Sequence, residues 1–357
     1  MKKFLKKISF YCVLLLLFVV TINTIFDPAN IFTGSGIETK IANYLSQGYN
    51  VANTPENMDE RILQKNVIQK LQNPPSTILL GSSKIMEIGR DYYGLSCLNH
   101  GVSGASVEDM IAIYQLYIEK GYADSIKKIV INIDPWLFNK NNEQSRWKTL
   151  SKEYYDFMNE DVSFTGKIPL HKYTQLVSIS YFQSSIKRIP KYLRQIQKKE
   201  NIMPTQDVIN NTLTRLTDGT IKYDIKYRKV TNFEIIKKTK REIAGRVYSM
   251  ENYTELSPDI ADALSLLVNK IKKNNTEIVF LLMPYNPIYY NHLTSINKYK
   301  IALQVEEFIK SYAKDNNITI LGSFNPEIFD LEIVDFYDGM HLSERGISKV
   351  FHQFANP

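Results

Sequence analysis

The sequence predicts an α/β protein built on a five-stranded parallel sheet. Five short, largely apolar runs typical of strands alternate with segments of helical period, at 77–81, 95–99, 128–133, 277–283 and 318–321. Strands that alternate with helices imply a parallel sheet with helices on both faces, joined by right-handed crossovers. The chain has 357 residues, 44% of them hydrophobic and 23% charged, which is enough to bury a sizeable core.

The N-terminus predicts a membrane anchor. Four lysines in the first seven residues precede an uncharged and mostly apolar stretch at 8–26, and about 19 such residues are enough to span a bilayer as a helix. Lysines stay on the cytoplasmic side, so we expect the rest of the chain outside the membrane. No small-x-small cleavage site follows, which favours an uncleaved signal-anchor at 1–30 over a removed signal peptide. A buried core helix is a third alternative.

The next segment is expected to be a stalk followed by the first helix, together covering 31–76. Residues 27–57 are polar and contain several glycines, which predicts irregular structure. Apolar residues at helical spacing predict an amphipathic helix over 58–72, which Pro74 and Pro75 end.

The first strand leads into the turn that organises the rest of the chain. Gly81 lets the backbone turn sharply, and Ser82 or Ser83 can cap the helix that follows. Ligands of α/β proteins bind at the carboxyl ends of parallel strands, next to helix N-termini. The alternative interpretation is a plain strand-to-helix turn with a capping serine.

Further helices complete the alternation. The second strand ends in a turn of small residues at 99–106, and the third runs directly into Asp134-Pro135-Trp136. Apolar periodicity and end signals predict helices at 83–89, 106–121, 260–273, 295–314 and 343–354.

The stretch at 139–257 breaks this rhythm and is expected to be a largely helical insertion or lid. A segment of this length should have structure of its own. We expect helices at 147–157 and 173–200, the second interrupted at Pro190. Its basic part, 187–199, is interpreted as a solvated face, and an anionic-polymer groove is the alternative.

A second polar turn precedes the last helix and contains Asp338, Gly339 and His341. A carboxylate beside an imidazole fixes its tautomer and stabilises the imidazolium that forms when the ring takes a proton. A serine needs such a base, because its free hydroxyl is a poor nucleophile. The turn follows the fifth strand, so it should lie at the same sheet edge as Ser83.

Three motifs now resemble the SGNH/GDSL hydrolase superfamily. They match its first, second and fifth sequence blocks in order, as Gly81-Ser82-Ser83, Asn99-x-Gly101-x-Ser103-Gly104 and Asp338-Gly339-x-His341-x-Ser343-x-x-Gly346. The resemblance implies a flavodoxin-like three-layer α/β/α fold and a catalytic domain at 77–138 plus 258–357, with the anchor and the insertion outside it.

The resemblance also implies roles for individual residues. Ser83 would be the nucleophile, His341 the base and Asp338 its orienting acid, and the backbone N–H groups of Ser83 and Gly104 would bind the oxyanion. Ser82 replaces the acidic residue of the family's first block, which leaves Ser82 as an alternative nucleophile.

The third block departs from the family pattern. The asparagine that completes the family's oxyanion hole is not at its usual place, because the strand ends Asn132-Ile133-Asp134-Pro135-Trp136. Asp134 could take that place, although a carboxylate repels an oxyanion unless it is protonated. Asn132 points the same way by strand alternation, so either side chain could face the site.

The expected function is that of an extracytoplasmic serine esterase or O-acyltransferase. The anchor, the Gly-Ser-Ser start and the Pro-Trp element are similar to the teichoic-acid D-alanyl transfer and alginate O-acetylation proteins. That similarity implies an acylated surface polymer or glycan as substrate, and an integral membrane acyltransferase as a partner. A catalytically silent scaffolding subunit of such an assembly is one alternative, and a flavodoxin-like phosphate binder is another.

The net charge and the cysteines indicate which partners and cofactors to expect. The net charge of +7 comes from dispersed lysines, which does not indicate nucleic-acid binding. The two cysteines, Cys12 and Cys97, offer neither a plausible disulfide nor a metal-ligand spacing. We therefore expect no metal and no cofactor.

Overall fold

Five apolar segments form the predicted parallel sheet, at or within about two residues of the expected positions. The sheet has the order β3-β2-β4-β8-β9, which is the flavodoxin-like arrangement. Its strands are β2 (Thr77–Leu80), β3 (Cys97–Asn99), β4 (Lys128–Asn132), β8 (Glu277–Leu282) and β9 (Thr319–Gly322).

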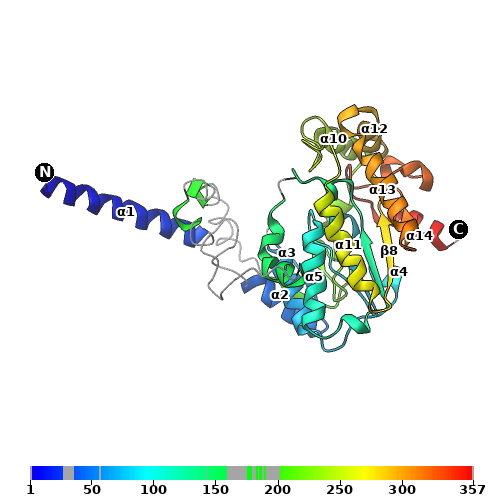
Figure 1. Ribbon diagram of the computed structural model, residues 1–357, viewed down its shortest axis with the longest axis horizontal. Coiled ribbons are helices and arrows are strands. Elements are labelled where there is room, and N and C mark those ends of the chain that lie inside the picture. The colour runs from blue at the N-terminus through cyan, green and yellow to red at the C-terminus, as the bar shows by residue number, and fades with distance from the viewer. Residues whose placement is uncertain are drawn as a thin grey trace.

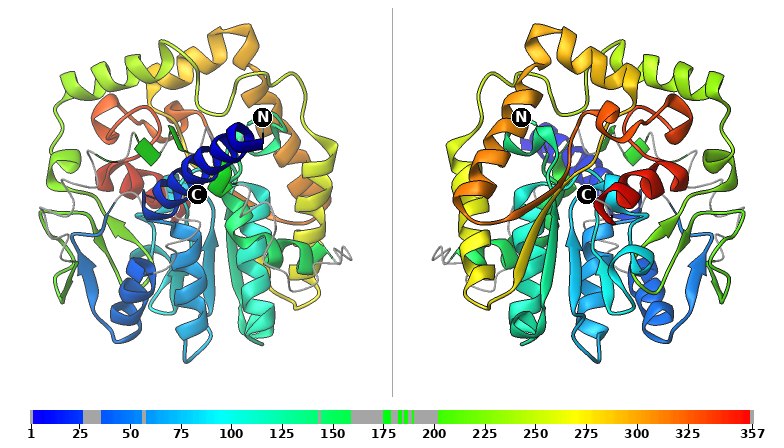
Figure 2. Two further views of the ribbon diagram at one scale, coloured as in Figure 1. Left: turned by 90° about the vertical axis from the view of Figure 1, so that its left-hand side faces the viewer. Right: turned by 90° about the vertical axis from the view of Figure 1, so that its right-hand side faces the viewer.

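The computed structural model describes residues 2–26, 36–55, 58–142, 144–158, 175–178 and 202–355, together with 182, 183, 185, 186 and 189. Within these ranges the chain is a three-layer α/β/α sandwich with an N-terminal apolar helix and an insertion (Figures 1 and 2). The fold class predicted from the sequence is therefore confirmed.

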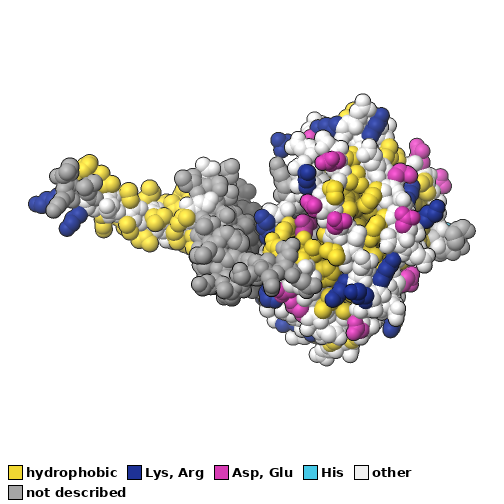
Figure 3. Space-filling model, viewed as in Figure 1, with side chains coloured by type: hydrophobic (Ala, Val, Ile, Leu, Met, Phe, Trp, Pro, Cys, Tyr) yellow, Lys and Arg dark blue, Asp and Glu magenta, His cyan; other side chains and the backbone are white. Residues whose placement is uncertain are grey.

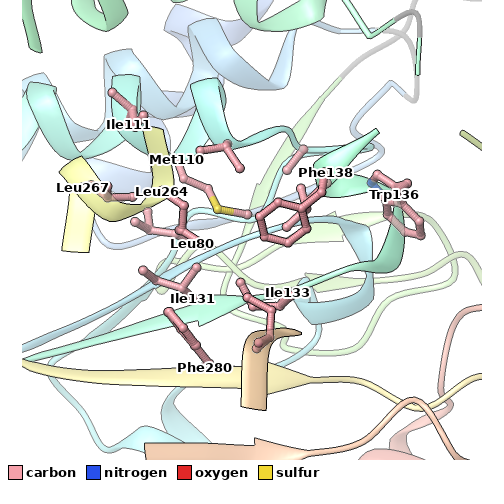
Figure 4. Packing of buried hydrophobic residues seen from close by; sticks show 14 of the residues in the cluster. Leu80, Met110, Ile111, Ile131, Ile133, Trp136, Phe138, Leu264, Leu267 and Phe280 are labelled. Atoms are coloured by element: carbon pink, nitrogen blue, oxygen red, sulfur yellow. The ribbon is translucent and has the colours of Figure 1, made fainter. Parts of the chain in front are cut away.

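Alternate residues of the strands face the two outer layers. Leu80, Ile131 and Phe280 pack in one apolar cluster with residues of α5 (Val107–Glu119) and α11 (Pro258–Lys272) (Figure 4). Their strand neighbours, among them Leu79 and Val130, belong to a second cluster that includes residues of α14 (Glu344–Ala355). Because successive side chains of a strand point to opposite faces, apolar side chains cover both faces of the sheet, as expected for a buried parallel sheet.

The helices around this sheet follow the predicted order, with three differences. The helix expected at 295–314 is a 3-10 turn at Asn297–Tyr299 followed by a helix at Ile301–Asp315, and the one expected at 83–89 is only a 3-10 turn at Ser83–Ile85. The helices at Arg90–Tyr93 and Pro287–Ser295 were not predicted. They are α3 (Glu60–Lys70), α4 (Arg90–Tyr93), α5 (Val107–Glu119), α11 (Pro258–Lys272), α12 (Pro287–Ser295), α13 (Ile301–Asp315) and α14 (Glu344–Ala355). Short 3-10 helices connect them: η1 (Ser83–Ile85), η2 (Ala123–Ser125), η3 (Pro135–Phe138), η6 (Asn297–Tyr299), η7 (Pro326–Phe329) and η8 (Ile333–Asp335).

The expectation of an irregular stalk at 27–57 is wrong for its described part. Helix α2 (Gly36–Ser46) and strand β1 (Asn50–Ala52) occupy it. Ile41 and Leu45 of α2 are buried in a small apolar cluster that also includes Leu63 of α3. Their i, i+4 spacing is the helical signal, and the surrounding glycines obscured it.

The insertion contributes strands as well as helices. In its described part, β5 (Met203–Thr205), β6 (Thr214–Arg215) and β7 (Ile221–Lys222) join β1 in a four-stranded antiparallel sheet of order β5-β1-β6-β7. Its helical elements are η4 (Arg146–Leu150), α6 (Ser151–Met158), η5 (Gln175–Val177), α9 (Ile225–Arg228) and α10 (Asn232–Ile243). Most of the helix predicted at 173–200, including its break at Pro190, lies outside the described residues.

The N-terminal helix α1 (Lys2–Phe26) is long and apolar enough to span a membrane. Its segment Lys6–Ile25 contains 20 residues with a mean hydropathy of 2.4. Hydrophobic side chains cover its surface, and basic side chains gather at its outer end (Figure 3). A signal sequence has the same character.

Two leucines of α11 test the packing of the sandwich. Leu264 is 1% exposed, whereas Leu266 on the opposite side of the same helix is 48% exposed. We expect Leu264→Ala to lower the free energy of unfolding by about 2–5 kcal/mol, because it leaves a cavity under the sheet. Leu266→Ala should change it by less than about 1 kcal/mol, since little apolar area is lost. Urea denaturation followed by circular dichroism measures both, and equal losses would contradict this packing.

Candidate active site

Ser83 lies at the carboxyl end of β2, where the strand turns into η1. Gly81 is needed in this turn because a Cβ there would lie 2.4 Å from the Cβ of Asn132 on the neighbouring strand. Ser82 caps η1, its Oγ accepting a hydrogen bond from the Lys84 N–H at 3.3 Å. Strand pairing and capping therefore fix the backbone that carries Ser83.

The two serines of the turn have different surroundings. Ser82 is 1% exposed, and both its N–H and its hydroxyl donate to Asn132 Oδ1, each at 3.2 Å. The Ser83 hydroxyl instead forms a hydrogen bond with His341 Nε2 at 2.9 Å. Of the two candidate nucleophiles, the structure therefore brings Ser83 to the imidazole and commits Ser82 to the adjacent strand.

Asp338 and His341 share a tight turn before α14. Asp338 Oδ1 accepts hydrogen bonds from the backbone N–H groups of Met340 and His341, at 2.8 and 2.9 Å. The carboxylate lies 3.0 Å from His341 Nδ1. A proton on Nδ1 then points at Asp338 and leaves Nε2 to accept from Ser83, which is the order of contacts that a serine–histidine–aspartate triad requires.

Burial and ion pairing set the charge of this pair. Burial acts to lower the pKa of His341, but the Asp338 carboxylate outweighs it, so the pKa of His341 is raised. Burial likewise acts to raise the pKa of Asp338, but His341, Lys238 and the Tyr227 hydroxyl outweigh it and hold the pKa well below its usual value. The arrangement keeps Asp338 ionised and stabilises a proton on the imidazole.

The insertion holds Asp338 from the other side. The Tyr227 hydroxyl of α9 donates to Asp338 Oδ2, and Lys238 Nζ of α10 lies 2.9 Å from the same oxygen. Glu242, one turn after Lys238, accepts the Gly339 N–H at 3.0 Å. Sequence reasoning missed these residues, because they lie about 100 positions from the turn and belong to no motif. An insertion that could only be interpreted as a lid from its sequence therefore takes part in the site.

A pocket of about 220 Å³ opens beside Ser83. Among the described residues that line it, two are cationic and none is a carboxylate; they are Ser83, Lys84, Ser103, Gly104, Trp136, Arg146, Tyr248, Met340 and His341. Trp136 lies at the end of the apolar cluster in Figure 4 and continues the core toward the pocket. The pocket thus joins the β2 turn, the turn after β3, the end of β4 and the insertion.

The candidate oxyanion residues are only partly brought together. Gly104 lines the same pocket as Ser83, in the left-handed region with φ +55°. Asp134 is fully buried and does not line the pocket, and burial raises its pKa. Asn132 is committed to Ser82, and its amide donates to the Leu281 carbonyl at 3.2 Å. Neither side chain from the end of β4 reaches the pocket beside Ser83.

Lys84 lines the pocket and forms an ion pair with the buried Asp134. Its ammonium donates to the Met283 carbonyl at 2.7 Å, lies 3.5 Å from the ring centroid of Tyr285, and is 3.8 Å from Asp134 Oδ1. Burial lowers the pKa of Lys84 to about 8, against the opposing effect of Asp134. The lysine that follows the serine therefore places a buried positive charge beneath the site.

His100, the other histidine near this edge of the sheet, belongs to the core. It is 1% exposed and lies between the Gln64 amide oxygen at 2.7 Å and the Tyr117 hydroxyl at 2.6 Å. Burial lowers its pKa to about 3, which keeps the ring neutral. No group of three potential metal ligands occurs within the described ranges.

Comparison with known proteins adds no family assignment. Neither a scan against protein-family models nor a search of curated proteins found a match to this chain.

The charge of Lys238 should have a measurable effect on the pKa of His341. Lys238 acts to lower the pKa of His341, so Lys238→Met should raise it and His341 should begin to protonate at a higher pH. NMR titration of the imidazole resonances in the full-length protein measures the shift directly. Lys237→Met is the matched control, because Lys237 is the exposed neighbour on α10. An unchanged His341 pKa in Lys238→Met would contradict the ion pair between Lys238 and Asp338.

Proposed function

We propose that the chain is an SGNH-type serine esterase or O-acyltransferase that works through an acyl group on Ser83. The observation that carries this proposal is the alignment of Ser83 Oγ, the His341 ring and the Asp338 carboxylate, with contacts of 2.9 and 3.0 Å. Three sequence blocks in the family order and a flavodoxin-like strand order support it.

The reaction follows from these contacts. His341 Nε2 removes the Ser83 proton as Oγ attacks an ester or thioester carbonyl, and Asp338 stabilises the imidazolium. The N–H groups of Ser83 and Gly104 donate to the developing oxyanion, and each such donor is worth roughly 3 kcal/mol in the barrier. His341 then returns the proton to the leaving group. Water would complete hydrolysis, and a glycan or polyol hydroxyl would complete acyl transfer.

The apolar helix α1 supports an extracytoplasmic location of the α/β unit. Basic residues at its N-terminal end favour a cytoplasmic tip, which would put the α/β unit on the other side. A tethered hydrolase or transferase is suited to acyl groups on a cell-surface polymer or glycan. The similarity to teichoic-acid and alginate acylation proteins supports an integral membrane acyltransferase as a partner.

One observation favours a second candidate, a catalytically silent binding or scaffolding subunit of a membrane acylation assembly. Asn132 is bound to Ser82 and does not supply an oxyanion donor in the pocket. Such a subunit would retain the fold and the pocket without forming an acyl-enzyme.

Fluorophosphonate labelling distinguishes these two candidates. We expect the full-length protein in detergent to label at Ser83 and to hydrolyse p-nitrophenyl acetate. Ser83→Ala should abolish labelling and lower turnover by at least about 10³-fold, because the nucleophile is lost.

Ser82→Ala is the matched control, since it removes the neighbouring hydroxyl and keeps the Ser83–His341 contact. It should still label at Ser83, although it loses a buried hydrogen bond. A folded wild-type protein that does not label would support the silent subunit, and full turnover by Ser83→Ala would rule out the Ser83 mechanism.

A further inference from the structure

The pocket requires a donor that the end of β4 does not supply. A tetrahedral intermediate on Ser83 carries its negative charge on one oxygen, which needs preorganised donors. The backbone N–H groups of Ser83 and Gly104 can provide two of them. Asn132 is turned to Ser82, and Asp134 is buried away from the pocket.

The Tyr248 hydroxyl is one donor in this pocket to which no role has been assigned. It accepts hydrogen bonds from Gln144 Nε2 and Arg146 Nη2, each at 3.0 Å. These two contacts occupy its lone pairs, and its own proton has no acceptor in the part of the chain that the structure describes. A second contact, from Arg146 Nε to Gln144 Oε1 at 2.9 Å, ties the two supporting side chains together.

The hydroxyl lies directly over Gly104. A Cβ at Gly104 would be 2.1 Å from Tyr248 Oη and 2.3 Å from Arg146 Nη2. The glycine, which also adopts φ +55°, therefore leaves the space that the hydroxyl occupies. The Trp136 ring meets the Tyr248 ring edge-on, with centroids 5.3 Å apart, and limits its movement. Tyr248 is thus held beside one expected oxyanion donor and in the same pocket as Ser83.

We propose that the Tyr248 hydroxyl is the third oxyanion donor, and that Arg146 and Gln144 are its positioning residues. This inference rests on the proposed Ser83 chemistry. An O–H whose oxygen accepts from a guanidinium is polarised and becomes a stronger donor. The insertion would in this way replace the side chain that the end of β4 does not provide.

The step balances without any further reactant. The Ser83 Oγ–carbon bond forms as the Ser83 proton moves to His341, and the carbonyl electron pair moves onto oxygen. Tyr248 donates a hydrogen bond to that oxygen and keeps its proton. When the intermediate collapses, the pair returns, the bond to the leaving group breaks, and His341 protonates the leaving group.

Tyr248→Phe in the full-length protein tests the assignment with p-nitrophenyl acetate, a neutral ester. We expect kcat to fall about 100-fold with KM nearly unchanged, because the lost hydrogen bond forms only in the transition state. Tyr49→Phe is the matched control, since Tyr49 is similarly exposed, at 41% against 37% for Tyr248, and lies outside this pocket. It should retain the wild-type rate.

An unchanged kcat in a folded Tyr248→Phe protein would overturn the assignment. A rise in KM at constant kcat would also overturn it, because the hydroxyl would then bind the ground state of the substrate. Full turnover by Ser83→Ala would refute the Ser83 chemistry itself. If Ser83→Ala loses turnover while Tyr248→Phe keeps it, only the role of Tyr248 is refuted.

A double-mutant cycle tests the support from Arg146. Arg146→Gln should lower kcat in the wild-type background and have almost no further effect in Tyr248→Phe, because Arg146 acts through the hydroxyl. Independent and additive losses would contradict that role. If Tyr248→Phe is only partly folded, the single variant Arg146→Gln still tests the assignment through its kcat, since Arg146 is exposed.

Discussion

The rest of the candidate site depends on the hydrogen bonds and ion pairs made by the buried carboxylate of Asp338. A buried charge is costly unless it is paired and hydrogen-bonded. Two backbone N–H groups of its own turn, the His341 ring, the Tyr227 hydroxyl and the Lys238 ammonium meet that requirement. The same contacts orient His341 so that Nε2 faces Ser83. The contacts that stabilise this one charge therefore connect the turn before α14, the insertion and the carboxyl end of β2.

This arrangement changes how the insertion is understood. The α/β sandwich supplies Ser83, Asp338 and His341, whereas the insertion supplies side chains behind the carboxylate and over the pocket. At the site its contacts are polar, through Tyr227, Lys238 and Glu242, whereas its Leu150, Val247 and Met250 join the apolar core of the sandwich. Such a division is consistent with a scaffold whose site is completed by an inserted segment.

The sequence predicted the parts of the structure that follow local rules. Buried strands such as 277–283 are continuous apolar runs, and parallel strands place their carboxyl ends at one edge, so the proximity of Ser83 and His341 could be inferred. Helix α2 was missed because glycines surround a short amphipathic pattern. Strands β5, β6 and β7 have two or three residues each, too few for a period to show. The contacts of Tyr227 and Lys238 with Asp338 bridge about 100 residues and leave no signal in a single sequence.

Trapping the acyl-enzyme is the most direct test of the central claim. The full-length protein would be incubated with p-nitrophenyl acetate, quenched in acid and digested, and its peptides sequenced by mass spectrometry. The account predicts one acetyl group on Ser83, and none on that residue in His341→Ala, because Nε2 must take the Ser83 proton. Acetylation of Ser82, or equal acetylation of Ser83 without His341, would contradict it.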